Sequence, residues 1–270
     1  MPILTTDVRW SPRNVPRGEK VALRRLALPT EHGGWGFLLE PILLALIVAP
    51  SIAGAAFAMA AVAGFLTRQP LRFALNDLLR RKSYPRTAAC WWLTAGYSAI
   101  TLLALAATTH LAGASVLLPI VLASPLAAFQ LVHDVNKRGR AMAPEIAGAA
   151  AMGSIAAAIA MSAGKAMPLA AALWCLAMLR SIPAIVFVRA VLGKSPRASA
   201  IALHLAAVAA SIALWRLELA PGIAAFAMSA LLVRAVLTRW RVEPARSVGI
   251  RELVFGTGAM IVAGVGYYWM

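Results

Sequence analysis

The stretch Leu28–Pro41, with the sequence LPTEHGGWGFLLEP, lies where a basic N-terminal segment ends and the first long apolar run begins. Glu40 lies inside this run, and Glu31 and His32 lie just before it. An ionisable side chain in an apolar membrane helix is costly to insert, so it usually has a partner or a function. We therefore expect polar residues from other parts of the chain to meet this stretch.

The composition indicates a polytopic membrane protein. The 270 residues are 61% hydrophobic and 13% charged, with a mean hydropathy of +0.77, whereas soluble domains are about half apolar and about one quarter charged. A net charge of +16 would suggest nucleic-acid binding in a soluble chain. Here the basic residues concentrate in the connections between apolar runs, so we predict a membrane-lipid partner and no nucleic-acid partner.

Nine apolar runs predict an all-α bundle of nine transmembrane helices. They are Trp35–Ser51, Ile52–Leu66, Ala88–Thr108, Gly113–Val132, Ala143–Ala163, Met167–Val188, Ala198–Trp215, Leu219–Leu237 and Glu252–Met270. The first two are separated only by the turn signal at Pro50 and Ser51, which favours a tight helical hairpin. Each can be lengthened into its polar flank, from Glu31 onward and through Asn76, to reach the length that a bilayer demands. We expect residues 28–270 to form a single transmembrane domain and residues 1–27 to form a basic, loosely ordered cytoplasmic tail.

Arginine and lysine residues are concentrated ahead of the first run and in every second connection after it. The positive-inside rule places such connections in the cytoplasm. With nine spans, the rule predicts a cytoplasmic N-terminus and an external C-terminus. We expect a multi-pass protein of the bacterial cytoplasmic (inner) membrane.

The candidate site residues lie near the predicted cytoplasmic ends of the helices. Arg180 interrupts an apolar run, and a central arginine costs roughly 2.5 to 3.5 kcal/mol to insert, so it should face protein. One interpretation is an ion pair with Glu40 or Glu145 that fixes helix register, and the other is binding of an anionic ligand. The residues predicted to bind the ligand are Arg68, Arg72, Asn76, Asp77, Arg140, Arg180 and Arg189. The residues predicted to position or protonate it are Glu31, His32, Glu40 and Glu145.

No cofactor is predicted, and the alternative interpretation is a site for a divalent metal. Imidazole and carboxylate groups are ordinary ligands of zinc, iron and manganese, which makes His32, His133 and Asp134 the candidates. His133 and Asp134 are neighbours in the sequence and therefore do not share a helix face.

Small residues are interpreted as packing residues. Ala149 and Gly153 have the small-xxx-small spacing that lets membrane helices approach closely. Glycines near the end of the chain are interpreted in the same way, with no functional role: Gly256, Gly258, Gly264 and Gly266.

Three sequence elements resemble the YwiC-like family of uncharacterised bacterial membrane proteins. They are PTEHGGWG (29–36), FLTRQPL (65–71) and PEIAG (144–148), and the resemblance covers nearly the whole chain after the basic tail. A weaker likeness is to the UbiA prenyltransferase superfamily, which implies nine helices, an internal N-terminus and polar motifs that face the cytoplasm. In that superfamily the motif Asn-Asp-x-x-Asp-x-x-x-Asp after the second helix holds magnesium on a prenyl diphosphate.

The chain departs from this motif. Asn76 and Asp77 match its start, but Arg80 and Tyr84 stand where the next two aspartates would be. Because magnesium needs hard oxygen ligands beside the phosphate, a conventional magnesium-dependent prenyltransferase is disfavoured. Arginine side chains can instead hold an anionic group directly, since guanidinium matches phosphate or carboxylate in bidentate geometry.

These observations predict a UbiA-like membrane protein with a cytoplasm-facing polar cavity. The cavity would bind the anionic head group of a phosphorylated or isoprenoid lipid, and the sequence leaves open whether the protein is an enzyme. One alternative is a transporter for a small anion, which needs a second gate on the outer side, where polar residues are scarce. The other is a non-catalytic accessory or assembly protein in which carboxylates neutralise Arg180 completely.

Overall fold

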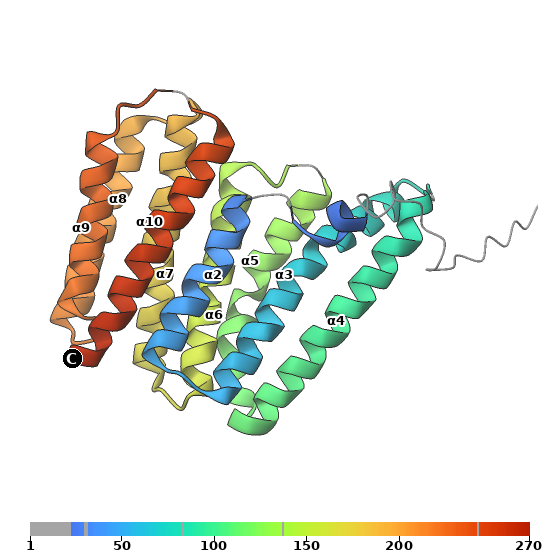
Figure 1. The fold of residues 1–270 in the computed structure, drawn as a ribbon, viewed down its shortest axis with the longest axis horizontal. Helices are drawn as coiled ribbons and strands as arrows, with labels where there is room; N and C mark the ends of the chain where they lie inside the picture. The colour runs from blue at the N-terminus through green and yellow to red at the C-terminus, as the bar shows by residue number, and fades with distance from the viewer. Residues whose placement is uncertain (1–22, 30–31, 83, 137, 242) are drawn as a thin grey trace, which may run out of the picture.

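The computed structural model describes residues 23–29, 32–82, 84–136, 138–241 and 243–270, and all regular structure in these ranges is helical (Figure 1). The long helices are α2 (His32–Val48), α3 (Ile52–Leu79), α4 (Pro85–Ala112), α5 (Leu118–Val135), α6 (Met142–Ser162), α7 (Met167–Val191), α8 (Arg197–Arg216), α9 (Gly222–Leu237) and α10 (Ala245–Gly266). Two short 3-10 helices, η2 (Ala114–Leu117) and η3 (Tyr267–Trp269), precede α5 and follow α10.

Seven helical stretches are long and apolar enough to cross a membrane: Ile52–Leu79, Pro85–Ala112, Ala114–Val135, Met142–Ser162, Met167–Val191, Arg197–Arg216 and Ala245–Trp269. Two shorter apolar helices, Gly34–Val48 and Gly222–Leu237, accompany them. The chain is therefore a multi-pass, all-helical membrane protein. Each predicted apolar run corresponds to one long helix of the described residues, while nine complete spans stay a prediction.

Polar residues continue two helices beyond their apolar runs. α3 runs past Leu66 through Pro70 to Leu79, close to the extension through Asn76 that its length favours, whereas α10 begins at Ala245 and not at the predicted Glu252. Proline is tolerated inside membrane helices because neighbouring groups satisfy the freed backbone carbonyl. Glu252 is tolerated because arginine side chains contact it inside the bundle.

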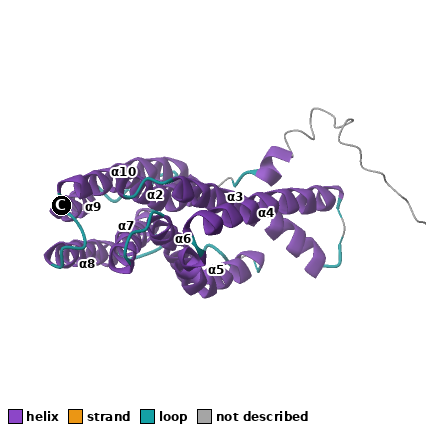
Figure 2. Ribbon diagram, turned by 90° about the horizontal axis from the view of Figure 1, so that it is seen from below, coloured by secondary structure: helices purple, strands orange, loops and turns teal. Residues whose placement is uncertain are grey.

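The helices form two layers, which are seen from one end of the bundle in Figure 2. One layer contains α9, α10, α2, α3 and α4, and the other contains α8, α7, α6 and α5. α2 packs chiefly against α10 and α6, whereas α3 packs chiefly against α4. The predicted tight hairpin of the first two helices is therefore not a packing unit. Its first helix instead lies centrally, next to the last helix of the chain.

Small side chains bring α6 close to its neighbours. Trp174 of α7 donates a hydrogen bond from Nε1 to the carbonyl oxygen of Ala150 on α6, at 2.8 Å. A Cβ atom at Gly153 would lie 2.9 Å from Cδ1 of the same indole, so any larger residue at this position would displace the ring. Close approach through small residues replaces the hydrophobic driving force that lipid does not supply between membrane helices.

The basic connections lie at one end of the bundle, uppermost in Figure 1, together with the start of α2, and the C-terminus lies at the other end. Residues 1–22 of the predicted tail lie outside the described residues. Residues 23–27 form a short helical segment whose Leu26 packs with Ala74, Ala89 and Cys90 of α3 and α4.

Candidate functional site

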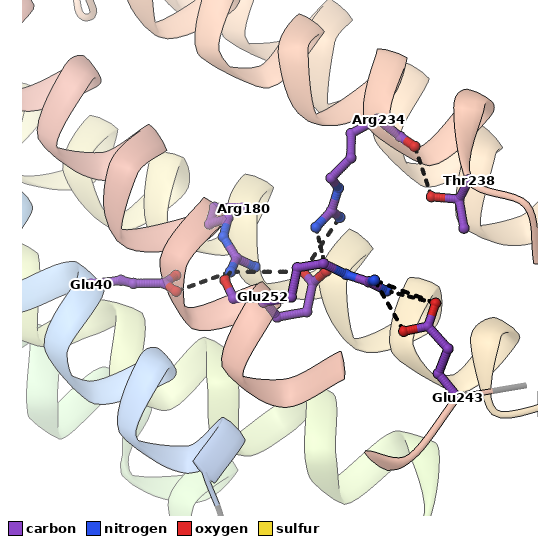
Figure 3. A network of polar contacts seen from close by, with 7 residues as sticks. Glu40, Arg180, Arg234, Thr238, Glu243 and Glu252 are labelled. Carbon is purple, nitrogen blue, oxygen red and sulfur yellow. Dashed lines mark hydrogen bonds and ion pairs between the residues drawn. The ribbon is translucent and has the colours of Figure 1, made fainter. Parts of the chain in front are cut away.

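A buried ion pair joins three helices in the middle of the bundle. Arg180 of α7 has only 3% of its surface exposed, and its Nη2 donates to Oε1 of Glu40 on α2 at 3.0 Å (Figure 3). The same nitrogen donates to the backbone carbonyl of Glu252 on α10 at 2.7 Å. Loss of Arg180 would leave Glu40 as an uncompensated charge in the interior, which destabilises strongly. The pair therefore fixes α2, α7 and α10 relative to one another.

Glu252 extends this network to α9. Its Oε1 pairs with Nη1 of Arg234, and its Oε2 accepts a hydrogen bond from Nη2 of Arg234 at 3.4 Å and lies 3.9 Å from Nη2 of Arg180. The Arg234 guanidinium also lies over the rings of Phe187 and Phe255, at 4.3 Å and 4.9 Å from their centroids. Figure 3 shows Glu252 between the two arginines. One carboxylate thus serves guanidinium groups from two helices.

Glu40 and Arg180 line a cavity of about 410 Å³. Its wall holds six basic side chains and three acidic ones: Arg68, Arg140, Arg180, Arg189, Lys194 and Arg246, with Glu40, Glu145 and Glu252. Arg189 lies nine residues after Arg180 on α7, which is about 14 Å of helix rise. The cavity therefore extends from the basic end of the bundle to its middle, and positive charge exceeds negative charge along it.

Two further arginines of the cavity wall have carboxylate partners. Arg68 of α3 pairs with Asp134 of α5, with Nη2 and Nε at 2.5 Å and 2.6 Å from Oδ2. Nη1 of Arg189 lies 3.3 Å from Oε2 of Glu145 and donates to the carbonyl oxygen of Arg140 at 3.0 Å. These pairs hold both guanidinium groups at the cavity wall.

Several guanidinium nitrogens in the cavity wall have no acceptor. Nε and Nη1 of Arg180 and Nε of Arg189 are buried and make no hydrogen bond within the described part of the chain. A buried donor without an acceptor costs roughly 1 to 3 kcal/mol, and more when it is charged. An oxygen-rich anion or water in the cavity would satisfy these donors.

The structure brings together six of the predicted site residues. Glu40, Arg68, Arg140, Glu145, Arg180 and Arg189 all line the cavity. Glu31 lies outside the described residues, and for His32 only the helical backbone is described.

Asp77, predicted as a ligand-binding residue, lies in a different cluster at the start of α4. Its Oδ1 accepts from Nη2 of Arg86 at 3.2 Å, and its Oδ2 accepts from Oγ1 of Thr87 at 2.8 Å. Arg72 donates to Oε1 of Gln69 at 3.0 Å. Neither Asp77 nor Arg72 lines the cavity, and the same is true of Asn76. Asp77 therefore joins α3 to α4, and Arg72 contacts a residue of its own helix.

The two described candidates for a metal site have other partners. Nδ1 of His133 lies 2.8 Å from the carbonyl oxygen of Phe129, and the Asp134 carboxylate is bound by Arg68. Within the ranges that the structure describes, no three histidine, cysteine, aspartate or glutamate residues lie close enough to hold a metal ion. The side chain of His32, the third candidate, is not among the described side chains, so a metal site that includes it stays a prediction.

Sequence reasoning missed three residues of the buried network. Arg234 interrupts an apolar run as Arg180 does, so the same signal could have found it. The hydropathy pattern places Glu252 at the first residue of the last helix, which hides its position inside the bundle. Gly256 allows close packing, as interpreted from the sequence, but the sequence did not show what packs against it: a Cβ atom there would overlap Nη2 of Arg180 and Oε1 of Glu40. Glycine at this position lets the ion pair lie against the backbone of α10.

Residues 28–160 match the family model described as YwiC-like protein. This segment, just under half of the chain, is similar to the YwiC-like family. The segment runs from just before α2 almost to the end of α6, and it supplies Glu40, Arg68 and Glu145 to the cavity. Arg180 and Glu252 lie beyond it. No curated protein and no solved structure gives a significant match to the chain.

Proposed function

We propose that this protein binds the anionic head group of a membrane lipid, phosphorylated or isoprenoid, in the cavity between α2, α3, α6, α7 and α10. The observation that carries the proposal is the excess of basic side chains around a cavity in which buried guanidinium nitrogens lack acceptors. A phosphate or carboxylate group supplies several oxygens to such donors. Charge-assisted hydrogen bonds of this kind are about twice as strong as neutral ones.

The depth of the cavity favours a ligand with charge at one end. Arg180 lies near the middle of α7, where the surrounding core is apolar, so its field is weakly screened. Arg189, Lys194 and Arg246 lie toward the basic end of the bundle. An anion that enters from this end meets basic side chains along its whole path, and Glu40 and Glu145 position or protonate the bound group.

The proposal includes nine spans with the basic end in the cytoplasm of a bacterial cell, as the positive-inside rule predicts. α2 and α9 have 17 and 16 residues, about 24 to 26 Å of helix, which is somewhat shorter than the roughly 30 Å hydrocarbon core. Local thinning of the bilayer accommodates such a mismatch at modest cost. The cavity then opens toward the cytoplasmic leaflet, where anionic lipid head groups are abundant. A UbiA-like transfer reaction is a separate prediction that lipid binding does not require.

The test is lipid analysis by mass spectrometry of protein purified from its native membrane. We expect wild type to retain at least one anionic lipid that Arg180→Gln and Arg246→Gln lose. Arg246 is exposed, so its replacement preserves the fold even if Arg180→Gln does not. Arg72→Gln is the matched control, because Arg72 lies outside the cavity wall. If both cavity variants keep every lipid that wild type keeps, the proposal is wrong.

The transporter alternative is less well supported by the far end of the bundle. A hollow of about 650 Å³ lies there, and Glu218 is the charged residue in its wall. A carboxylate at the exit would repel an anion, whereas a transporter needs a path that attracts its substrate at both ends. Anion flux into proteoliposomes distinguishes transport from lipid binding.

A further inference from the structure

A second hollow, of about 390 Å³, lies between α3, α5 and α6, and we call it the chain groove. Its wall is largely apolar and includes Phe57, Phe65, Leu131 and Ile155. Among the described residues of this wall, one side chain is charged. It is Arg68, which also lines the cavity around Glu40 and Arg180, called the cationic cavity from here on. The chain groove therefore suits hydrocarbon along its length and an anion at one end.

The chain groove and the cationic cavity meet at four shared residues, Arg68, Gln130, Gly148 and Met152. The amide of Gln130 lies directly against the backbone of Gly148, since a Cβ atom on that glycine would overlap it. The shared wall thus contains a charged guanidinium, a polar amide and an apolar thioether. A ligand that crosses it would pass from the charged cavity to the apolar groove.

The chain groove opens at the side of the bundle. Gly64 on α3 and Ala127 on α5 line it and are exposed. In a membrane protein an exposed side of an apolar helix faces hydrocarbon, so a lipid chain can enter laterally while its head group enters the cavity.

We infer that the ligand is an amphipathic lipid whose hydrocarbon chain lies in the chain groove while its anionic head group lies against Arg68 and Arg180. This inference rests on the proposed function and narrows its ligand class, because a small anion would leave the chain groove unused. It also separates a bound lipid from the lipids that surround any membrane protein. Occupation of the chain groove by the bound lipid depends on the arginines of the neighbouring cavity, whereas a surrounding lipid needs no such cations.

The experiment uses the full chain in phosphatidylcholine nanodiscs that contain phosphatidic acid with a diazirine near the end of one acyl chain. After illumination, labelled peptides are quantified by mass spectrometry. We expect label to concentrate in residues 57–71 and 120–131 of wild type. Gly64→Leu should lower it at least fivefold, because a Cβ atom at Gly64 meets Thr101 only at an ordinary 3.8 Å and the added side chain fills the chain groove. The series Gly64→Ala, Gly64→Val, Gly64→Leu should lower it stepwise, even if the largest variant folds poorly.

Gly96→Leu is the matched control for the added volume. Gly96 lies on α4 outside the chain groove, and a Cβ atom there has no neighbour within 4 Å. Its labelling should equal that of wild type. Arg246→Gln leaves the chain groove unchanged but removes a cavity cation, so it should also lower labelling, by about threefold or more. Equal labelling of wild type, Gly64→Leu and Arg246→Gln would overturn the inference.

Inorganic diphosphate, measured by its effect on thermal unfolding, separates this inference from the proposed function. We expect it to stabilise wild type and Gly64→Leu alike and to stabilise Arg246→Gln less. If diphosphate stabilises the protein but the Gly64 variants are labelled in the chain groove as strongly as wild type, the cavity binds an anion and the inference of a lipid chain in the groove is wrong. No effect of diphosphate together with unchanged lipid retention in the cavity variants would refute the proposed function itself.

Discussion

Gly256 of α10 offers a sharp test of the buried network, because Gly256→Ala adds one methyl group at a position where the structure has no space for it. The new Cβ atom would overlap Nη2 of Arg180 and Oε1 of Glu40. The two side chains must separate or the helices must move apart. Gly258 lies two residues further along the same helix and on a different face. It is the matched control, because a Cβ atom there has no neighbour within 4 Å.

The expected size of the effect follows from two opposing terms. Separation of the pair leaves an uncompensated buried charge, and breaking a buried pair in this way destabilises by about 3 to 5 kcal/mol. Replacing glycine by alanine within a helix stabilises by about 1 kcal/mol. We therefore expect Gly256→Ala to lower the free energy of unfolding by about 2 to 4 kcal/mol. Gly258→Ala should leave it unchanged or raise it by up to about 1 kcal/mol.

The measurement is denaturant-induced unfolding in mixed micelles, with helicity followed by circular dichroism. Free energies of unfolding are compared between variants whose dependence on denaturant concentration has the same slope. A third variant identifies the cause of the loss. If Gly256→Ala acts through the ion pair, it should cost little in a background that already carries Arg180→Leu and Glu40→Leu, because interacting sites are not additive. Equal stability of Gly256→Ala and Gly258→Ala, or an undiminished loss in that background, would refute the described contact.

Three further changes test other parts of the structure. Arg180→Leu alone should lower the free energy of unfolding by about 3 to 5 kcal/mol, and adding Glu40→Leu should recover part of this loss, because removing both charges of a buried pair costs far less than removing one. In the same unfolding assay, a double variant less stable than Arg180→Leu would contradict this. Asp77→Asn should lower the free energy of unfolding by roughly 1 to 3 kcal/mol, because the hydrogen bonds to Arg86 and Thr87 of α4 become weaker. The retained lipids should be those of wild type, and a different set of lipids would place Asp77 in the binding site. Gly148→Ala should displace the flexible end of Gln130 and lower labelling in the chain groove with little loss of stability, and unchanged labelling would show that the junction does not matter.

Hydropathy predicted the helices because the bilayer demands long apolar stretches. It misplaced the start of α10, where the helix begins among polar residues, and it left the polar part of α3 to be inferred from the length that a bilayer demands. Inside a bundle a charged side chain pairs with a residue from another helix. The hydropathy averaged over one stretch of sequence does not reveal that partner. Glu252 shows this directly, since its partners Arg180 and Arg234 come from α7 and α9.

The sequence could mark Arg180 as a residue that faces protein, but it could not choose its partner. Glu40 and Glu145 were equal alternatives by position. The structure pairs Arg180 with Glu40 and pairs Arg189 with Glu145. This choice depends on how α2 and α6 pack against α7, which the apolar pattern of each helix leaves undetermined.

The prediction for Asp77 followed a family motif and overlooked helix geometry. Arg68 and Asp77 lie nine residues apart on α3, which is two and a half turns at about 3.6 residues per turn. They therefore project from opposite sides of the helix. Arg68 reaches Asp134 of α5 and the cavity, while Asp77 reaches Arg86 and Thr87 of α4.

The buried network makes the YwiC-like segment and the rest of the chain one unit. Glu40 lies within residues 28–160, but its partner Arg180 and the backbone carbonyl that binds the same guanidinium lie beyond them. Without α7 and α10, Glu40 would be an unpaired charge in an apolar core, which is strongly unfavourable. The cavity has the same division, because Arg68 comes from the matched segment and Arg189 does not. An anion held between these two arginines would therefore tie both parts of the chain together at the basic end, as the ion pair ties them in the middle.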